Sequence, residues 1–567
     1  MTSSATQSQA AALAAPVFSA LLLALAMPGL TGWWPLLFVA LIPLLWAART
    51  LPSAVQSGCM GMFFGLLYYF SLMYWIIIVL KRYGGLHTVV AAAALLLLAL
   101  YLAAYTAFFC ILLNRLTSRT GSFSASVLLA APTIWVGLDV ARGWLFTGLP
   151  WMDLGYGLYS QPLLVQAADL GGHHLITFFI IQINALLLWL LERLFSPYRT
   201  SKRQISLAVM SFLVIYCAGG YSMLRWQQIG SEAAMASQAT AAAVQGNISQ
   251  DEKWSPALKQ ETVARYLALS EEAARKGGLD LLVWPETALP FYPHREPLMN
   301  KVKTFAKEKQ VYLLTGSPYF TVRPGRQPQE EPVSASQSNN LLKIVEDFKN
   351  LLSAESSNTL RPVEYFNSAI LLDRSGTQTG RYNKQHLVPF GEYVPLRNFL
   401  WFIKPLVELI GDFTPGESSK PLEAGHIKAG VLICFESIFP NIARNTTAEG
   451  ANLLVNLTND AWYGRSSAPQ QSWAMTVLRA VENRRSLVRA ANTGISGFIA
   501  PTGEVIQQSS LFTEAYRRES VPLLTGQTFF VQGGYWFGPV CLLLTGYLLI
   551  HAVWMARKRR QKGGAEK

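Results

Sequence analysis

Charged residues are scarce in this chain. Only 14% of its 567 residues are Asp, Glu, Lys or Arg, against roughly 25% in soluble domains, while 51% are hydrophobic. This composition excludes an ordinary soluble protein and indicates a chain that lies largely in a membrane. The sequence also has no repeats, no heptads and no glycine-rich phosphate loop, which excludes repeat proteins, coiled coils and P-loop nucleotide-binding proteins.

Cysteine is also rare, with five in the whole chain. Cys59, Cys110, Cys217 and Cys541 lie in apolar stretches, where a thiol usually acts as a small hydrophobic group. Cys434 stands apart, in a more polar part of the chain that has no second cysteine with which it could form a disulfide. A lone thiol of this kind is either a packed core residue or a protected nucleophile.

Long apolar stretches are abundant, and a helix needs about 20 such residues to cross roughly 30 Å of hydrocarbon. We predict eight spans, at residues 11–28, 33–48, 58–80, 89–113, 123–138, 175–191, 205–221 and 534–555. No basic residue precedes the first stretch, so a cleaved signal peptide is not expected. The spans predict a membrane domain of seven helices at 1–222, a soluble domain at 223–532, and a last helix with a basic tail at 533–567.

The formal charge is +13, which could indicate nucleic-acid binding, but many basic residues flank the apolar stretches. If the spans alternate in direction, one side of the membrane holds Arg49, Arg115, Arg119, Arg193, Arg199, Lys202, Arg203, Lys562 and the basic residues of 557–560. The short loops of the other side hold only Lys81, Arg82 and Arg142. The richer side is expected to be the cytoplasm. Both termini are therefore predicted in the cytoplasm, and 223–532 in the periplasm of a bacterium with an inner membrane.

The soluble block alternates short apolar runs with polar, helix-like segments, which predicts an α/β domain. The expected strands are 241–244, 279–283, 312–314, 368–372, 429–433, 453–457 and 496–500, with helices at 255–276 and 471–485. Residues 323–362 are polar and rich in Pro, Ser, Gln, Asn and Glu, which indicates a tolerated surface insertion. Functional groups are expected where strands end.

Three polar islands follow apolar runs in this block. Val431-Leu432-Ile433 ends at Cys434, whose thiol would lie beside backbone N–H groups able to hold an oxyanion. Alone, the cysteine would more often be a packed core residue. A second run ends at Glu286, which is either a base within reach of the thiol or a surface acid.

The third island, Tyr382-Asn383-Lys384, follows a hairpin-like segment. A lysine near the thiol would lower the pKa of the thiol and stabilise developing negative charge, although an isolated lysine is nearly always solvated. His386 is an alternative base, but a neutral hydrogen-bonding role is favoured.

As an ordered set, Glu286 in Trp-Pro-Glu, Lys384 in Tyr-Asn-Lys and Cys434 in Ile-Cys-Phe-Glu, with Asn-Leu-Thr-Asn-Asp at 456–460 and Trp462 downstream, closely resembles the nitrilase superfamily. The resemblance implies a Glu-Lys-Cys triad on an α-β-β-α sandwich. Seven spans before this domain and one after it narrow the resemblance to the bacterial apolipoprotein N-acyltransferase family. The fold class implied is a multi-pass α-helical membrane domain joined to that nitrilase-like sandwich.

Further motifs support this narrower resemblance: Gly-Leu-Pro-Trp at 148–151, Gln-Gly-Asn-Ile at 245–248 leading to Lys253-Trp254, and residues 386–395. It implies that the triad or substrate binding is assisted by Trp151, Trp254, Glu392, Phe435 and Glu436. Phe435 stands where some relatives carry Tyr, and the segment 323–362 is longer than the family pattern suggests.

The resemblance implies transfer of a fatty acyl chain from a membrane glycerophospholipid to the N-terminal amine of S-diacylglyceryl-cysteine in an apolipoprotein. The chain would work through a Cys434 thioester, with no cofactor and no metal, and with the bilayer rather than nucleic acid as its surroundings. Two alternatives stay open. A membrane-tethered nitrilase-like amidase or ester hydrolase would keep the triad, and a transporter would place paired charges inside its spans, for which Asp139 and Arg142 are candidates that more often pair locally.

Overall fold

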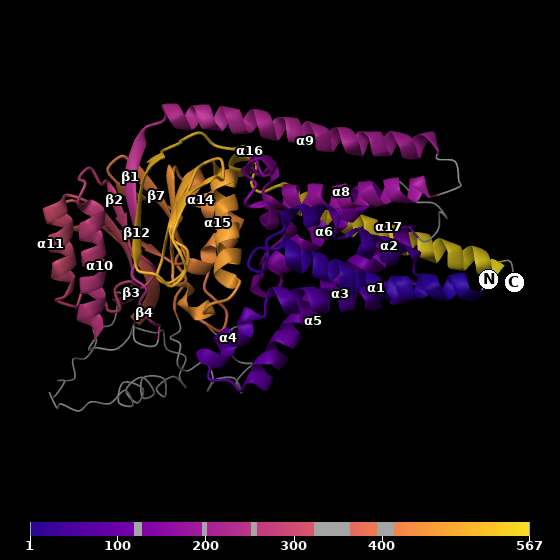
Figure 1. Cartoon of the computed structure of the whole chain (residues 1–567), viewed down its shortest axis with the longest axis horizontal. Coiled ribbons are helices and arrows are strands. Elements are labelled where there is room, and N and C mark those ends of the chain that lie inside the picture. Colours follow the sequence, from indigo (N-terminus) through magenta and orange to yellow (C-terminus); the bar gives the residue numbers. More distant parts are fainter. Residues whose placement is uncertain are drawn as a thin grey trace.

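In a computed structural model, the chain has a helical bundle at one end and two stacked β-sheets flanked by helices at the other (Figure 1). The structure describes residues 2–117, 127–195, 201–250, 258–322, 363–393 and 413–565. Trp254 and the predicted insertion 323–362 lie outside the described residues. The start of α1 and the end of α17 lie together, at the end of the bundle farthest from the sheets (Figure 1).

The bundle is built from a long N-terminal run of helices and one C-terminal helix. Its helices are α1 (Thr2–Ala26), η1 (Trp34–Phe38), α2 (Ile42–Thr50), α3 (Ala54–Leu72), α4 (Trp75–Arg82), α5 (Thr88–Thr117), α6 (Val127–Trp144), η2 (Leu145–Thr147), η3 (Leu154–Leu158), η4 (Pro162–Leu164), α7 (Ala168–Gly171), α8 (His173–Leu194), α9 (Lys202–Met235), α16 (Phe529–Gln532) and α17 (Phe537–Ala565). Among the described residues, α5, α8, α9 and α17 are long and apolar enough to cross a membrane. The chain is therefore a membrane protein.

Four other predicted spans differ from a single long helix. Helices α3 and α4 meet at a bend of 56° and count as a fifth span only when taken together. The first two predicted spans correspond to shorter apolar helical stretches, Ala14–Ala26 and Trp34–Thr50. The fifth corresponds to α6, an 18-residue helix that contains both Asp139 and Arg142. The total of eight spans therefore stays a prediction.

Helix α9 runs across the domain boundary that composition suggested at residue 222. Its 34 residues span about 50 Å, which exceeds the hydrocarbon thickness of a bilayer. The helix lies along the molecule from the bundle to the sheets, where β1 begins (Figure 1). The change from membrane-like to soluble composition therefore occurs within one continuous helix.

The soluble part is a sandwich of two six-stranded sheets. The first sheet has the order β12-β1-β2-β3-β4-β5, and the second has the order β11-β10-β9-β8-β7-β6. The strands are β1 (Gln238–Gln245), β2 (Leu281–Val283), β3 (Tyr312–Val322), β4 (Val363–Leu372), β5 (Gln378–Asn383), β6 (Leu422–Ala424), β7 (Ile427–Ile433), β8 (Leu453–Thr458), β9 (Ser486–Ala491), β10 (Gly497–Ile499), β11 (Val505–Gln508) and β12 (Ala515–Pro522). Each predicted strand coincides with one of these.

Burial on both faces explains why the strands inside each sheet are mostly apolar. In β1, Ala241 and Ala243 pack between the sheets, whereas Ala242 and Val244 pack under the outer helices. Helices α10 (Lys259–Ala274) and α11 (Met299–Lys309) cover the first sheet, and α14 (Pro440–Ala448) and α15 (Ala468–Asn483) cover the second (Figure 1). The α-β-β-α sandwich predicted from the sequence is confirmed.

Helix α15 joins the sandwich to the bundle. One hydrophobic cluster runs through both parts and contains Leu37 and Trp151 of the bundle together with Trp473 and Val477 of α15. At its centre the Gln471 side chain accepts hydrogen bonds from the indole N–H groups of Trp75 (3.2 Å) and Trp151 (2.8 Å), and donates to the backbone carbonyl of Leu72 (3.1 Å). These contacts hold α4 at the bend and fix the bundle against the second sheet.

We expect Gln471→Leu to lower the apparent unfolding temperature of the detergent-solubilised protein. The change leaves two buried indole N–H groups without an acceptor, at about 1–3 kcal/mol each. The neighbouring Gln470→Leu, on a partly exposed position of the same helix, serves as the control and should change stability by less than about 0.5 kcal/mol. Equal melting curves for the two variants would contradict the role of Gln471 at the junction.

Candidate active site

Cys434 stands at the turn between β7 and the short helix η8 (Cys434–Ile438). Its backbone has a φ of 53°, in the left-handed region that residues with a side chain rarely adopt. Such strain is kept where the surrounding structure fixes the chain, as at catalytic turns. The side chain is half-buried, and it packs at the edge of the apolar cluster between the two sheets.

Glu286 comes from the other sheet, just after β2, and is 7% exposed. One carboxylate oxygen accepts from the Asn367 side chain at 2.8 Å, and the other accepts from the backbone N–H of Asn459 at 3.0 Å. Gly316 of β3 permits this position, since a Cβ there would lie 2.5 Å from the Glu286 Cα. The carboxylate is thus held between the carboxyl ends of strands from both sheets.

Lys384 follows β5 and is 1% exposed. Its ammonium lies 2.9 Å from Glu392 Oε1 and 3.7 Å from Glu286 Oε1. Asn367 joins the two carboxylates, since its amide also donates to Glu392 at 2.8 Å. Burial alone would lower the pKa of Lys384, but Glu392 and Glu286 outweigh burial and hold that pKa above its ordinary value. The lysine is therefore a buried, charged cation.

The thiol lies within the electrostatic reach of this cluster. Burial and, to a lesser extent, the charge of Glu286 raise the pKa of Cys434 to about 12, although Lys384 acts in the opposite direction. At neutral pH the resting residue is consequently a thiol rather than a thiolate. Because only the thiolate is a strong nucleophile, attack requires a base that removes the proton during the reaction.

Glu436 joins the cysteine turn to the lysine segment. Its buried carboxylate accepts from the backbone N–H of Ile433 at 2.6 Å, next to Cys434. It also accepts from the backbone N–H of Gln385 at 2.6 Å, next to Lys384, and from the Tyr382 hydroxyl at 3.0 Å. Burial raises the pKa of Glu436 to about 7, although these donors favour the charged form. The side chain positions both residues without contacting either functional group.

Aromatic rings lie beside the cysteine turn. The His386 ring lies 3.7 Å from the ring centre of Phe439, and Phe435 packs edge-on against Phe439 at 5.2 Å. Burial, followed by the charge of Lys384, lowers the pKa of His386 to about 4. The imidazole is therefore neutral at physiological pH, as the sequence analysis expected. Phe435 contributes an apolar wall and no hydroxyl group.

The loop after β8 connects this centre to the membrane helices. Asn459 is followed directly by η9 (Asp460–Tyr463), which packs against α4. The Trp462 ring meets the Tyr83 ring edge-on at 4.8 Å, and the Tyr83 hydroxyl donates to the Ala461 carbonyl at 3.0 Å. The candidate active site therefore lies on the side of the sandwich that faces the bundle.

The predicted site residues fall into two groups. Glu286, Lys384, Cys434, Glu392 and Glu436 come together with Phe435 at the ends of β2, β5 and β7. Trp151 instead lies in the junction, where its ring packs 4.9 Å from that of Trp75, and Trp254 lies outside the described residues.

Sequence reasoning missed Asn367 and the specific contact of Asn459 with Glu286. The one signal for Asn367 is its place in the middle of β4, where it and Ser368 interrupt an otherwise apolar stretch between Phe366 and Leu372.

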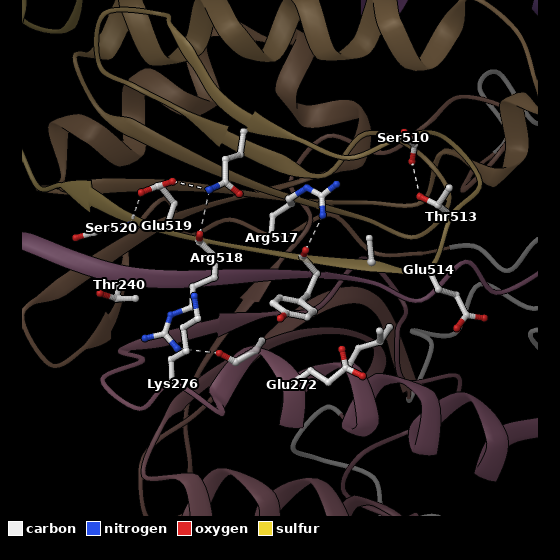
Figure 2. A pocket seen from close by; sticks show the side chains of 15 residues that line it. Thr240, Glu272, Lys276, Ser510, Thr513, Glu514, Arg517, Arg518, Glu519 and Ser520 are labelled. Atoms are coloured by element: carbon white, nitrogen blue, oxygen red, sulfur yellow. Dashed lines mark hydrogen bonds between the residues drawn. The ribbon is translucent and has the colours of Figure 1, made fainter.

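Two other sites are separate from this centre. An open hollow of about 920 Å³ lies between β12 and α10 and is lined by mixed charges that include Lys276, Arg518 and Glu519, but by none of the active-site residues (Figure 2). Among the described residues, the group of His and Asp side chains close enough to hold a metal also lies elsewhere, in the junction.

Comparisons with known proteins agree with this architecture. Residues 19–186 match the family model for the apolipoprotein N-acyltransferase N-terminal domain, and residues 240–524 match that for carbon-nitrogen hydrolase. A solved carbon-nitrogen hydrolase from Helicobacter pylori aligns with 51% of this chain and 90% of its own, at 16% identity and a TM-score of 0.35. The Saccharomyces cerevisiae protein Nit3 aligns with 50% of this chain and 90% of its own, at 16% identity and a TM-score of 0.34.

Curated relatives cover both parts of the chain. An apolipoprotein N-acyltransferase from Geobacter metallireducens is 38% identical over 96% of this chain and 95% of its own length. Another, from Methylococcus capsulatus, is 30% identical over 82% of this chain and 80% of its own. With the membrane bundle, the nitrilase-like sandwich and these relatives in agreement, the chain belongs to the apolipoprotein N-acyltransferase family.

Proposed function

We propose that this enzyme transfers a fatty acyl chain from a membrane glycerophospholipid to the N-terminal amine of S-diacylglyceryl-cysteine in apolipoproteins, through a thioester on Cys434. The observation that carries the proposal is the buried cluster of Glu286, Lys384 and Glu392 on the bundle-facing side of the sandwich, in which the charges of Glu286 and Lys384 act on the Cys434 thiol. Within this family, such a cluster supplies the base, the cation and the nucleophile that acyl transfer needs.

In the first half-reaction, Glu286 removes the thiol proton of Cys434 as the sulfur attacks the ester carbonyl carbon of the phospholipid. The carbonyl oxygen becomes an oxyanion, which Lys384 and a backbone N–H at the start of η8 stabilise. When the tetrahedral intermediate collapses, the bond from carbon to the glycerol oxygen breaks. Glu286 returns the proton to that oxygen, so that a lysophospholipid leaves and the acyl thioester remains.

In the second half-reaction, the lipoprotein amine attacks the thioester carbon and gives a proton to Glu286. Collapse of this intermediate breaks the carbon–sulfur bond, and the thiolate recovers the proton. The aromatic and apolar surroundings of the sulfur, with Phe435 and Phe439 on one side, disfavour water as the competing acceptor. Because the phospholipid donor and the lipoprotein acceptor react one after the other, both can use the same site.

The remaining charged residues act through the triad. Glu392 neutralises Lys384 and, with Asn367, holds Glu286 in position. Glu436 fixes the spacing between the cysteine turn and the lysine segment. We assign Glu392, Asn367 and Glu436 as positioning residues. Trp151 instead helps to hold the sandwich against the bundle.

We also propose the predicted topology in the bacterial inner membrane: a membrane domain at 1–222, a periplasmic catalytic domain at 223–532, and a last span with a cytoplasmic tail at 533–567. The one-sided distribution of basic residues supports it. So does the common location of the start of α1 and the end of α17, away from the sandwich (Figure 1).

The triad assignment predicts distinct losses of the acyl-enzyme, measured by intact mass after incubation with phospholipid. Cys434→Ala should give no adduct. Lys384→Ala should slow its formation by about 10²–10³-fold through loss of oxyanion stabilisation. Glu286→Gln should slow it by at least about 10²-fold, since no base serves the thiol. Adduct formation by Glu286→Gln at the wild-type rate would show that Glu286 is not the base.

Glu436→Gln belongs to the same experiment as a positioning variant. It turns one acceptor oxygen into an amide NH₂ that faces a backbone donor, so we expect slower acylation with an unchanged requirement for Cys434. The matched control is Glu423→Gln, on an exposed position of β6, which should react like the wild type. Equal rates for the two variants would remove Glu436 from the proposal.

The second half-reaction separates the proposed transferase from a membrane-tethered hydrolase. With a diacylglyceryl-cysteine peptide present, the acyl-enzyme should discharge to an N-acylated peptide, whereas in buffer alone it should persist. Both species are measured by mass spectrometry. A peptide with an acetylated N-terminus provides the control, because it has no amine to acylate. Rapid release of free fatty acid with the peptide unmodified would establish hydrolysis and contradict transfer.

The topology predicts opposite labelling of two lysine positions, tested after each is changed to cysteine in intact cells. A membrane-impermeant thiol reagent that enters the periplasm should modify Lys420→Cys, which is exposed in the sandwich. It should modify Lys558→Cys, near the end of α17, only after the inner membrane is opened. The reverse pattern would refute the proposed orientation.

A further inference from the structure

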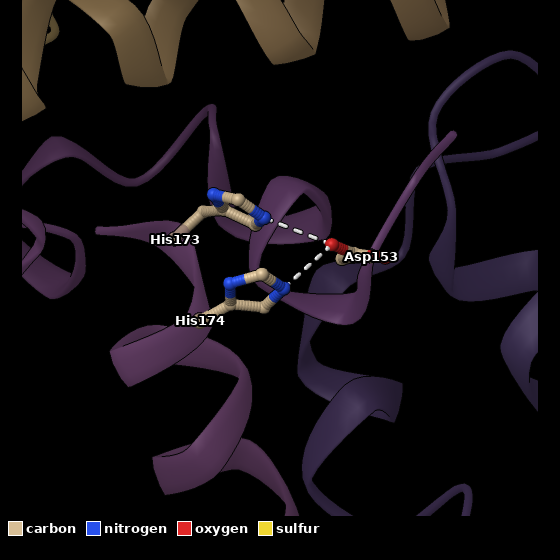
Figure 3. Close-up of side chains that lie close together, drawn as sticks. All are labelled: Asp153, His173 and His174. Carbon is tan, nitrogen blue, oxygen red and sulfur yellow. Dashed lines mark hydrogen bonds and ion pairs between the residues drawn. The ribbon is translucent and has the colours of Figure 1, made fainter. Parts of the chain in front are cut away.

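Three buried side chains meet in the junction between the bundle and the sandwich. Asp153 lies just before η3, and His173 and His174 begin α8. His173 Nε2 lies 2.8 Å from Asp153 Oδ2, and His174 Nε2 lies 3.2 Å from the same oxygen. Figure 3 shows both imidazole rings pointing at this one carboxylate oxygen. The three candidate ligand atoms all lie within 4.8 Å of one another.

The outer nitrogen of each ring has a partner of its own. His173 Nδ1 lies 3.2 Å from Glu482 Oε1 on α15, and His174 Nδ1 is hydrogen-bonded to the Tyr535 hydroxyl. Histidines that bind metals usually donate Nδ1–H to a carboxylate or another oxygen, which leaves Nε2 as the ligand. With the proton on Nδ1, His173 would donate to Glu482 and His174 to the Tyr535 oxygen, which is this arrangement.

Hydrogen bonding alone leaves one inner nitrogen unexplained. His173 Nε2 can donate to Asp153 Oδ2, whereas His174 Nε2, on a ring that is 97% buried, faces the same oxygen at 3.2 Å without the geometry of a regular hydrogen bond. A buried polar atom with a poorly formed hydrogen bond is costly, because it has lost its hydrogen bonds to water. A cation placed among the three inner atoms would give each of them a partner at once.

We propose that Asp153, His173 and His174 bind a divalent transition metal of the zinc type. Two imidazole nitrogens and one carboxylate oxygen form a ligand set that zinc prefers. With bonds of about 2.0–2.2 Å, tetrahedral ligand atoms lie roughly 3.3–3.6 Å apart. His174 Nε2 is near this separation from Asp153 Oδ2, at 3.2 Å, and His173 Nε2, at 2.8 Å, would move outward by about 0.5 Å on metal binding. Three protein ligands leave the fourth position to a water molecule or a small anion.

The surrounding charges are compatible with a dication. Asp153 uses its other oxygen, Oδ1, for Arg142, which also pairs with Asp139 at 3.2 Å, the local pair expected from the sequence. Arg479 lies 3.0 Å from Glu482 Oε1 and neutralises that carboxylate. Three carboxylates and two guanidinium groups leave a net charge of −1 when both histidines are neutral, which a metal ion would turn to +1.

The position of the cluster indicates a structural role. Asp153 and the two histidines belong to the bundle, whereas Glu482 belongs to α15 of the sandwich, and Thr528 donates to the Glu482 backbone carbonyl at 2.7 Å just before α16. A metal there would fix the seat of the sandwich on the bundle. It takes no part in the proposed transfer, whose residues lie elsewhere. The family resemblance implied no metal, and the sequence analysis did not single out these three residues.

The test measures zinc in the full-length protein, purified in detergent with the affinity tag removed and dialysed without chelator. We expect about one zinc per chain by elemental mass spectrometry, and less than about one tenth in His174→Asn and Asp153→Asn. His426→Asn changes an exposed histidine of the sandwich and should keep the full content. Zinc that stays unchanged in the cluster variants would be an adventitious ion only, and would overturn the proposal.

Two measurements keep the proposal falsifiable if the variants fold poorly. X-ray absorption at the zinc edge of the wild type should show about two imidazole ligands, and His174→Cys should keep the metal while adding one sulfur ligand. Removing zinc with a chelator should lower the unfolding temperature by several degrees, and zinc should restore it. If the protein contains no metal and zinc leaves its unfolding temperature unchanged, the proposal is overturned. His173 then joins Asp153 and Glu482 through hydrogen bonds alone. Because the acyl adduct on Cys434 is measured separately, failure of this proposal is distinguishable from failure of the transfer mechanism.

Discussion

Lys384 is almost fully buried, and its ammonium remains charged because carboxylates lie against it. An isolated ammonium in such a place would lose its proton, since desolvation by burial costs several kcal/mol. Glu392 at 2.9 Å and Glu286 at 3.7 Å remove that penalty, and Asn367 holds both carboxylates at the required separation. A fixed cation is thereby kept beside a neutral thiol. It can stabilise an oxyanion at the moment this forms, without solvent reorganisation.

This pairing constrains the rest of the sandwich. The lysine comes from the first sheet and the cysteine from the second, so the two sheets must keep a fixed separation at one end. Glu436 provides the direct link, because one carboxylate contacts backbone groups on both sides. The strained turn at Cys434 is compatible with this link, since the N–H of Ile433 is held just before the turn. The geometry of Cys434, the proposed nucleophile, thus depends on Glu436, which has no part in the proposed chemistry.

The apolar runs were sufficient to predict seven strands of an α/β domain, and the resemblance to the nitrilase superfamily implied the sandwich and the residues that gather in the site. Strands buried on both faces, such as β7 and β8, are continuous apolar runs and are easily recognised, and polar residues at their ends are conspicuous. Strands at or near the sheet edges, such as β5, β11 and β12, alternate or are polar, and they were missed. Asn367 and the Asp153 cluster depend on contacts between residues distant in sequence, which no local pattern reports. The bend between α3 and α4 likewise follows from the docking of Trp75 on Gln471 rather than from any helix-breaking residue.

Composition divides the chain at residue 222 into a membrane domain and a soluble domain, but side-chain packing joins the two. Helix α15 belongs to the sandwich by sequence, yet all but one of its residues are buried, and Arg479 and Glu482 are fully covered by η3 and the start of α8. Arg484, just beyond the helix, is buried against Asp169 of α7 and Gln166. Removed from the bundle, the sandwich would expose this apolar helix face together with charged groups that have lost their partners. Leu432 of β7 and Leu454 of β8 share one hydrophobic cluster with α15. The membrane helices therefore support the proposed active site as well as anchoring it.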